Sequence, residues 1–336
     1  MKKELYISRY VRPFFEDYLT CRKNVSNCTI HSYRDVIKLF FQFAAKQSRK
    51  APAKLLISDI EESIVISFLT HLEKNRRNLI RTRNHRLALL RKFFEYLSCQ
   101  EPIWAESCRR VMEIPKKRGV VDSEICYLEK EEIKAVFNVI DTKTTIGRRD
   151  HAILLFMYNS GARVQETADL RLSWLSLEEP YKVEIFGKGR KYRTCPLWKS
   201  TAIVLQKFIS GRAQPIEKCD HIFLNRMGKP LSRFGIWNII KKHKAKAAAG
   251  SPSLKSKKVT PHTIRHTTAM HLLQSGVEIN VIRGWLGHVK LETTHRYAEI
   301  DMAMKRKALK SCEVKNGRSS NSWRSDANIL AWLESL

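Results

Sequence analysis

The 336-residue chain lacks several features that would assign its class at once. It has no run of 18 or more apolar residues, so no segment is long enough to span a membrane. Its first residues, Met1-Lys2-Lys3-Glu4-Leu5, do not contain the apolar core of a signal peptide. The eight cysteines are scattered, with no Cys-x-x-Cys pair and no zinc-site spacing. We interpret them as free, mostly structural thiols, which indicates a reducing compartment and therefore the cytoplasm.

Acidic residues are scarce relative to basic ones. The chain has 62 Lys and Arg against 33 Asp and Glu, which gives a net charge of +29 and an isoelectric point near 10.0. Such an excess usually serves a polyanionic partner, because each neutralised phosphate releases condensed counterions. Nucleic acid is the favoured partner, ahead of an acidic membrane surface or a merely solvated basic exterior.

The hydrophobic pattern predicts two domains, in agreement with roughly 100–200 residues per domain. Apolar residues recur at spacings of three and four from residue 5 to about 99, which predicts a helical first domain over 1–105. The second half of this region has a basic polar face, which we expect to contact DNA; a solvated face that aids solubility is the alternative. The expected contacts are Arg81, Arg83, His85 and Arg86.

The pattern breaks after Pro102, and the charged stretch Pro115–Gly119 suits an exposed linker, predicted over 106–125. A second domain is predicted over 126–312. Within it, residues 181–186 and 192–197 form two expected strands, joined by a glycine-rich basic tip.

Two further basic or polar segments follow in the second half of the chain. A lysine run between residues 238 and 258, which includes Lys241 and Lys242, is expected to be a mobile loop that touches the DNA backbone. The tail over 313–336 is expected to end in a short amphipathic helix that docks on another subunit; the alternative is that it folds back onto its own subunit.

Several residues of the second half suit chemistry on a phosphodiester. Metal-free cleavage needs a nucleophile, cations for the non-bridging oxygens and a proton donor for the departing 5′ oxygen. Arginine suits the second role because its planar fork matches two phosphate oxygens. Arg163 follows a tight turn at Gly161, and Glu166 lies three residues on, where it can orient the guanidinium. In isolation this would be an ordinary surface ion pair.

A Thr-Pro pair signals a helix start immediately before His262, which then shares a face with Arg265. His262 and His266 are four residues apart, so a metal site must be weighed. The zinc-protease pattern requires Glu directly after the first His, where this chain has Thr263. Because no carboxylate cluster supplies further ligands, we predict no metal.

Taken in order, five segments resemble the active-site set of the tyrosine recombinase, or phage integrase, family. They are Gly161–Glu166, Gly187–Lys191, Thr260–His266, Leu286–His288 and Thr293–Tyr297. The resemblance extends to residues 29–34 and 83–88, which look like the family's core-binding domain. It departs at residues 173–177, where relatives often have an aspartate, at a strand entry away from the chemistry.

The resemblance implies a role for each matching residue. The implied catalytic set is Arg163, Lys188, His262, Arg265, His288 and Tyr297, with Glu166 in support. Tyr297 would be the nucleophile, and Lys188 would protonate the leaving oxygen. Arg190 and Lys191 lie close to Lys188 and are expected to contact DNA.

The implied fold is mainly α with a small antiparallel β-sheet, in two domains that form a C-shaped clamp on DNA. Tyr297 would attack the scissile phosphate to give a 3′-phosphotyrosyl link, which a 5′ hydroxyl then reverses without ATP, metal or any other cofactor. We expect a site-specific recombinase that acts on double-stranded DNA as a homo-oligomer, in a tetrameric synapse, with or without related recombinases, on the cytoplasmic nucleoid.

The biological setting stays open between integration, excision, transposition and dimer resolution. No arm-binding domain is expected before the core-binding region. Two alternatives are a type IB-like topoisomerase that acts as a monomer and a DNA-binding regulator that does not cleave.

Overall fold

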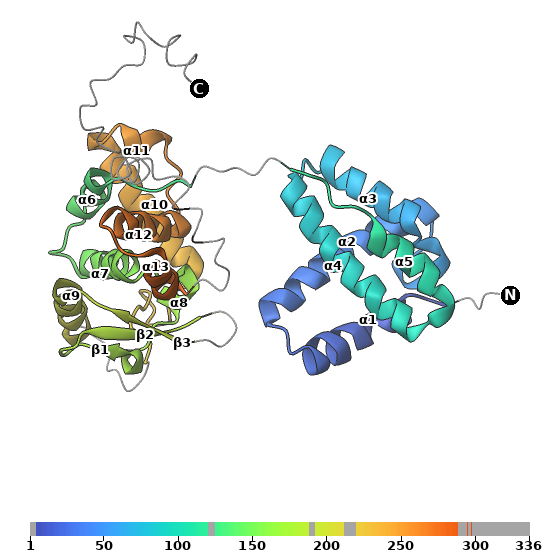
Figure 1. Ribbon diagram of the computed structural model, residues 1–336, viewed down its shortest axis with the longest axis horizontal. Helices are drawn as coiled ribbons and strands as arrows, with labels where there is room; N and C mark the ends of the chain where they lie inside the picture. Colours follow the sequence, from blue (N-terminus) through green and yellow to red (C-terminus); the bar gives the residue numbers. More distant parts are fainter. Residues whose placement is uncertain are drawn as a thin grey trace, which may run out of the picture. The chain divides into compact units, whose positions relative to one another are not determined.

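The computed structural model describes residues 5–119, 125–187, 192–211 and 220–287, together with Thr294 and Tyr297. The chain divides into two compact units, Met1–Asp122 and Ser123–Leu336, each with its own hydrophobic core (Figure 1). Among the described residues, no helix is both long enough and apolar enough to cross a membrane.

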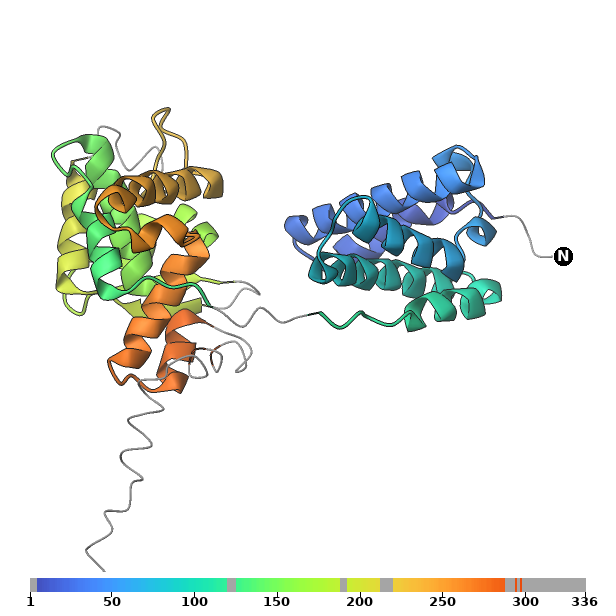
Figure 2. The ribbon, with the colours of Figure 1, turned by 90° about the horizontal axis from the view of Figure 1, so that it is seen from above.

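The first unit is helical over its described residues. Its α-helices are α1 (Ser8–Pro13), α2 (Asn27–Ser48), α3 (Glu62–Lys74), α4 (Ile80–Gln100) and α5 (Ala105–Glu113). A π-helical segment (Phe14–Arg22) continues α1, and short 3-10 turns span Pro52–Lys54, Ile57–Asp59 and Pro102–Trp104. The longer helices pack side by side (Figure 2). Their apolar stripes, predicted from spacings of three and four, meet in a core rich in buried phenylalanine.

Helix α5 occupies the N-terminal half of the predicted linker, so the prediction of a linker over 106–125 is wrong there. Cys108 and Val111 are buried in the core of the first unit. Pro102 begins a 3-10 turn between α4 and α5 rather than ending the domain, because proline is tolerated in the first turn of a helix. The chain leaves helical structure after Glu113, and its described extended stretch ends at Gly119.

The second unit combines helices with a three-stranded antiparallel sheet. The elements are α6 (Lys130–Asn138), α7 (Thr145–Ser160), α8 (Val164–Ala168), a 3-10 turn (Leu172–Trp174), β1 (Leu175–Ser176), β2 (Lys182–Phe186), β3 (Tyr192–Pro196), α9 (Lys199–Ser210), α10 (Arg233–Gly250), α11 (Ser253–Ser256), α12 (Pro261–Gln274) and α13 (Ile279–Leu286). The strand order is β1-β2-β3, and Val183 of β2 pairs with Leu175 on one side and Cys195 on the other. The mainly helical fold with a small antiparallel sheet is therefore as predicted.

Helix α10 extends through most of the lysine run that the sequence led us to expect as a mobile loop, so that prediction is wrong. Four alanines between residues 245 and 249 are strong helix formers, and Ala247 and Ala248 are buried in the core. Lys241 and Lys242 are thus exposed side chains at fixed positions on a helix.

Candidate active site

Two glycine turns bring distant segments of the second unit together. Helices α7 and α13 end at Gly161 (φ 59°) and Gly287 (φ 65°), in the left-handed conformation that favours glycine. A Cβ on Gly161 would lie 2.5 Å from Cδ2 of Leu286, and a Cβ on Gly287 would lie 2.9 Å from Cδ of Arg193. Both turns therefore need glycine for conformation and for close approach, and they present carbonyl groups to the arginines described next.

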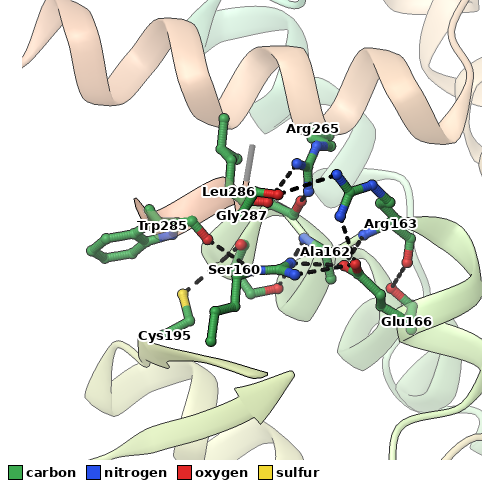
Figure 3. Close-up of polar contacts among 12 residues, drawn as sticks. Ser160, Ala162, Arg163, Glu166, Cys195, Arg265, Trp285, Leu286 and Gly287 are labelled. Atoms are coloured by element: carbon green, nitrogen blue, oxygen red, sulfur yellow. Dashed lines mark hydrogen bonds and ion pairs between the residues drawn. The ribbon is translucent and has the colours of Figure 1, made fainter. Parts of the chain in front are cut away.

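Arg163 and Glu166 form the pair that their spacing predicts. Arg163 is the N-cap of α8; its backbone N–H donates to Oε2 of Glu166 at 2.8 Å, and its Nη1 donates to Oε1 at 2.8 Å. Its Nη2 donates to the carbonyl of Gly287 at 3.4 Å (Figure 3). The Arg163 side chain is 31% exposed and that of Glu166 is 5% exposed. Glu166 thus fixes one edge of a guanidinium that remains open to a ligand.

Arg265 lies beside Arg163 and is held by backbone carbonyls (Figure 3). Its Nη1 donates to the carbonyl of Gly161 at 2.6 Å, and its Nη2 donates to that of Leu286 at 2.5 Å. Burial, followed by the charges of Arg163 and Arg193, lowers the pKa of Arg265 to about 9. A bound anion would relieve this repulsion, so the cluster of arginines electrostatically favours a phosphate.

Arg193 is a site residue that the sequence analysis missed. Its Nη2 and Nη1 donate to the two Glu166 oxygens at 2.7 and 3.1 Å, and its Nε donates to the carbonyl of Trp285 at 3.0 Å. Burial opposes ionisation of Glu166, but the bonds from Arg193 and Arg163 lower its pKa to about 2. A signal was available: Arg193 lies two residues before Cys195 in a strand, so their side chains share a face, and Cys195 is buried on the inward one.

His262 occupies the first turn of α12, one turn before Arg265. Thr260 caps this helix and Pro261 is its first residue, as the sequence predicts. Partial burial, then the positive charges of Arg265 and Arg163, lowers the pKa of His262. The ring is therefore biased toward its neutral form, which can both donate and accept a hydrogen bond.

Tyr297 is buried, with 2% of its surface exposed, in an apolar cluster that includes Leu273 and Leu286. Its hydroxyl oxygen lies 2.8 Å from Nδ1 of His266. The two other tyrosines compared with it from sequence have different settings. Tyr158 is bonded to His271, and Tyr192 is 72% exposed.

The structure thus brings together Arg163, Glu166, His262, Arg265 and Tyr297, with the unexpected Arg193 and His266. Lys188, Arg190, Lys191 and His288 lie outside the described residues, as does the tail over 313–336. Within the described part of the chain, no group of three or more His, Cys, Asp or Glu side chains could hold a metal ion.

The residues expected to contact DNA in the first unit differ in exposure. Arg81 and His85 are exposed on α4, and Arg86 is half-buried. Arg83 is buried: Nη1 donates to the carbonyl of Pro115 at 3.2 Å, and Nε lies 3.3 Å from Glu73. Arg83 therefore anchors the chain that leaves α5, and the prediction that it contacts DNA is wrong for this structure.

Neighbouring side chains of α4 bind the same stretch. The side chain of Asn84 donates to the carbonyl of Lys117 at 2.7 Å and accepts from its backbone N–H at 3.1 Å. Arg91 donates to the carbonyl of Ile114. Polar residues on a helix face thus bind linker backbone, which sequence alone does not distinguish from binding phosphate.

The family comparisons agree with this geometry. Residues 126–304 match the phage integrase family, and residues 14–101 match the phage integrase N-terminal SAM-like domain. The chain is 36% identical over 336 residues to "Putative integrase/recombinase y4rC" of Sinorhizobium fredii, with all of both chains covered. It is 32% identical over 291 residues to tyrosine recombinase XerC of Anoxybacillus flavithermus, covering 85% of this chain and 91% of the relative.

A solved structure shows the same fold. XerH site-specific recombinase bound to a palindromic difH substrate has a TM-score of 0.67 and 22% identity, covering 85% of this chain and 80% of the other. The chain belongs to the phage integrase family and is a tyrosine recombinase, an enzyme that cleaves and rejoins DNA strands in site-specific recombination.

Proposed function

We propose that Tyr297 is the nucleophile and that Arg163 and Arg265 bind the scissile phosphate. The observation that carries this proposal is the cluster of three arginines around Glu166, which adjoins a tyrosine on another segment. Attack by Tyr297 forms a 3′-phosphotyrosyl link and releases a 5′ hydroxyl. A 5′ hydroxyl of a partner strand reverses the step, so the bond energy is retained without ATP.

His262, beside both arginines, is proposed to bond a non-bridging oxygen. Lys188 is proposed to protonate the leaving 5′ oxygen, and His288 completes the set. Arg81, His85, Arg86, Lys241 and Lys242, with Arg190 and Lys191, are proposed to contact the DNA backbone. Their positive charge suits the polyanionic partner that the net charge of +29 favours.

The partner is proposed to be double-stranded DNA bound by a homo-oligomer. The XerH relative is described in complex with its difH substrate. We propose that the first unit, including α5, forms a core-binding domain and that residues 126–312 form the catalytic domain, closing on DNA as a C-shaped clamp. The tail over 313–336 is proposed to dock on an adjacent subunit of a tetrameric synapse, on DNA in the cytoplasm.

The decisive experiment is covalent trapping. A duplex with the recombination site, nicked so that the 5′ product is lost, should become linked to the wild-type protein and not to Tyr297→Phe. DNA affinity should be nearly equal for both, because one hydroxyl adds little to an interface dominated by phosphate contacts. Tyr158→Phe is the matched control. Trapping by Tyr297→Phe would refute the nucleophile assignment, and loss of wild-type trapping in EDTA would indicate a metal.

A further inference from the structure

His266 contacts the oxygen that the proposed function assigns as nucleophile. Nδ1 of His266 lies 2.8 Å from Oη of Tyr297, and the ring centroids are 5.7 Å apart. His266 is half-buried and Tyr297 is buried, so this contact lies away from bulk water. The hydroxyl is the reactive group of the Tyr297 side chain. A basic nitrogen within hydrogen-bond distance of it can therefore affect that reactivity.

Helix α12 places this nitrogen beside the phosphate-binding arginine. Arg265 and His266 are consecutive, and the ring of His262 is 6.4 Å from that of His266. The hydroxyl also interacts electrostatically with the guanidinium: burial and neighbouring arginines lower the pKa of Arg265, whereas charge on Tyr297 raises it. One turn of helix therefore supplies a cation for a developing phenolate and a nitrogen able to take its proton.

We propose that His266 is a catalytic residue that accepts the proton of Tyr297 as it attacks. This inference rests on the proposed function, because it takes Tyr297 as the nucleophile. In cleavage, the Oη–H bond breaks, its proton moves to Nδ1 of a neutral His266, and Oη forms a bond to phosphorus. The P–O5′ bond breaks, and the leaving oxygen takes a proton from the general acid, a role assigned to Lys188.

Rejoining reverses each of these transfers. The 5′ hydroxyl attacks phosphorus and returns its proton to the general acid, while Oη leaves with the bonding electrons and regains its proton from the His266 imidazolium. One histidine thus serves as base in cleavage and as acid in rejoining, as microscopic reversibility requires.

The same helix offers a matched control in a second histidine–tyrosine pair. Nδ1 of His271 lies 2.7 Å from Oη of Tyr158, and both side chains pack within the unit. His271 has no contact with the three arginines among the bonds described for it. If histidine–tyrosine bonds of α12 serve only packing, then the two pairs should respond alike to substitution.

The test measures covalent trapping and rejoining for His266→Phe, which keeps the ring volume, and His266→Asn, which keeps an acceptor but takes no proton. We expect trapping to slow at least 100-fold in His266→Phe, with an intermediate loss in His266→Asn, since general-base catalysis typically contributes about 10²–10⁴-fold. His271→Asn should trap at the wild-type rate at a temperature where it is folded. All three should bind DNA as the wild type does.

A second substrate separates proton transfer from damage to the site. DNA ending in a 3′-(p-nitrophenyl) phosphate supplies a leaving group that needs no proton, so it can be rejoined by Tyr297→Phe. Addition of His266→Phe to Tyr297→Phe should leave this rejoining unchanged, whereas addition of Arg163→Ala should slow it strongly.

Three outcomes would overturn the proposal. Wild-type or faster trapping by His266→Phe would mean that the bond is irrelevant or holds the nucleophile back. Equal slowing of trapping and nitrophenyl rejoining would mean that His266 only supports the site. A loss in His271→Asn equal to that in His266→Phe would reduce both pairs to packing. Trapping by Tyr297→Phe would instead refute the proposed function itself.

Discussion

Glu166 and Asp150 are both buried carboxylates of the second unit, and each binds two cationic or basic side chains closely. Glu166 contacts Arg163 and Arg193 at 2.8 and 2.7 Å. Asp150, on α7, contacts Arg149 at 2.8 Å and Nε2 of His243, on α10, at 2.9 Å. Hydrogen bonds from these partners lower the pKa of each carboxylate against the opposing effect of burial.

The two clusters differ in how much of their cationic side chains stays exposed. Arg163 keeps 31% of its side chain exposed and lies next to buried Arg265, so positive charge is left over for a ligand. Arg149 and His243 keep 16% and 3%, and His243 joins α10 to α7. A buried carboxylate does not by itself mark a site; the surplus of positive charge beside it does.

The largest effect is expected from a substitution in the Asp150 cluster. Asp150→Ala leaves Arg149 and His243 buried without their carboxylate, and removing one partner of a buried pair typically costs about 3–5 kcal/mol. Urea unfolding should show that loss in the free energy of unfolding. Cleavage per folded molecule should stay near the wild-type rate at low temperature, and a selective loss of cleavage would place Asp150 in the site.

The next largest effect is expected from the Glu166 cluster, whose positive charge is proposed to serve the chemistry. Arg163→Ala should slow covalent trapping at least 100-fold, because removing one transition-state charge donor typically costs ~2.7–4 kcal/mol. Its half-exposed position should keep the stability loss well below that of Asp150→Ala. Single-turnover trapping and thermal unfolding measure the two quantities. If Arg163→Ala and Asp150→Ala lost equal stability, the two clusters would not differ in their contribution to folding.

The third prediction concerns how the stability contributed by Glu166 depends on pH. Its pKa is about 2 in the folded protein against an ordinary value of 4.5, so the carboxylate stabilises the fold above about pH 4.5. This contribution, on the order of 3 kcal/mol, is lost as pH falls toward 2. Unfolding of wild type and Glu166→Gln from pH 7 to 3 should show a stability gap that narrows below pH 4.5. A stability difference that stays constant from pH 7 to 3 would contradict the lowered pKa of Glu166.

The smallest effect concerns Lys242 at the edge of the Asp150 cluster. Its Nζ lies 3.5 Å from the carboxylate, and its side chain is 48% exposed. Exposed ion pairs typically contribute about 0–1 kcal/mol, so Lys242→Met should change unfolding free energy by less than about 1 kcal/mol. DNA affinity should fall modestly and with weaker salt dependence if this lysine contacts phosphate.

The prediction of the site succeeded where local sequence order sets local geometry. The spacing of Arg163 and Glu166 and the Thr-Pro start of α12 are confirmed by the contacts of the structure. The prediction failed where a side chain had several available partners. Arg83 belongs to a basic helix face, yet it binds the carbonyl of Pro115, some 32 residues away. The Ala-rich end of α10 is helical because alanine has the highest helix propensity.

Sequence by itself determined the mainly helical class, the hairpin of β2 and β3, the preference for a polyanionic partner and the order of the residues proposed to react. The first three follow from periodicity, composition and spacing along the chain, and the last follows from the resemblance to a family. Only the tertiary structure decided that Arg193 shares Glu166 with Arg163, and that His266 meets Tyr297. Those contacts join segments 27 and 31 residues apart, and burial among particular neighbours selects them.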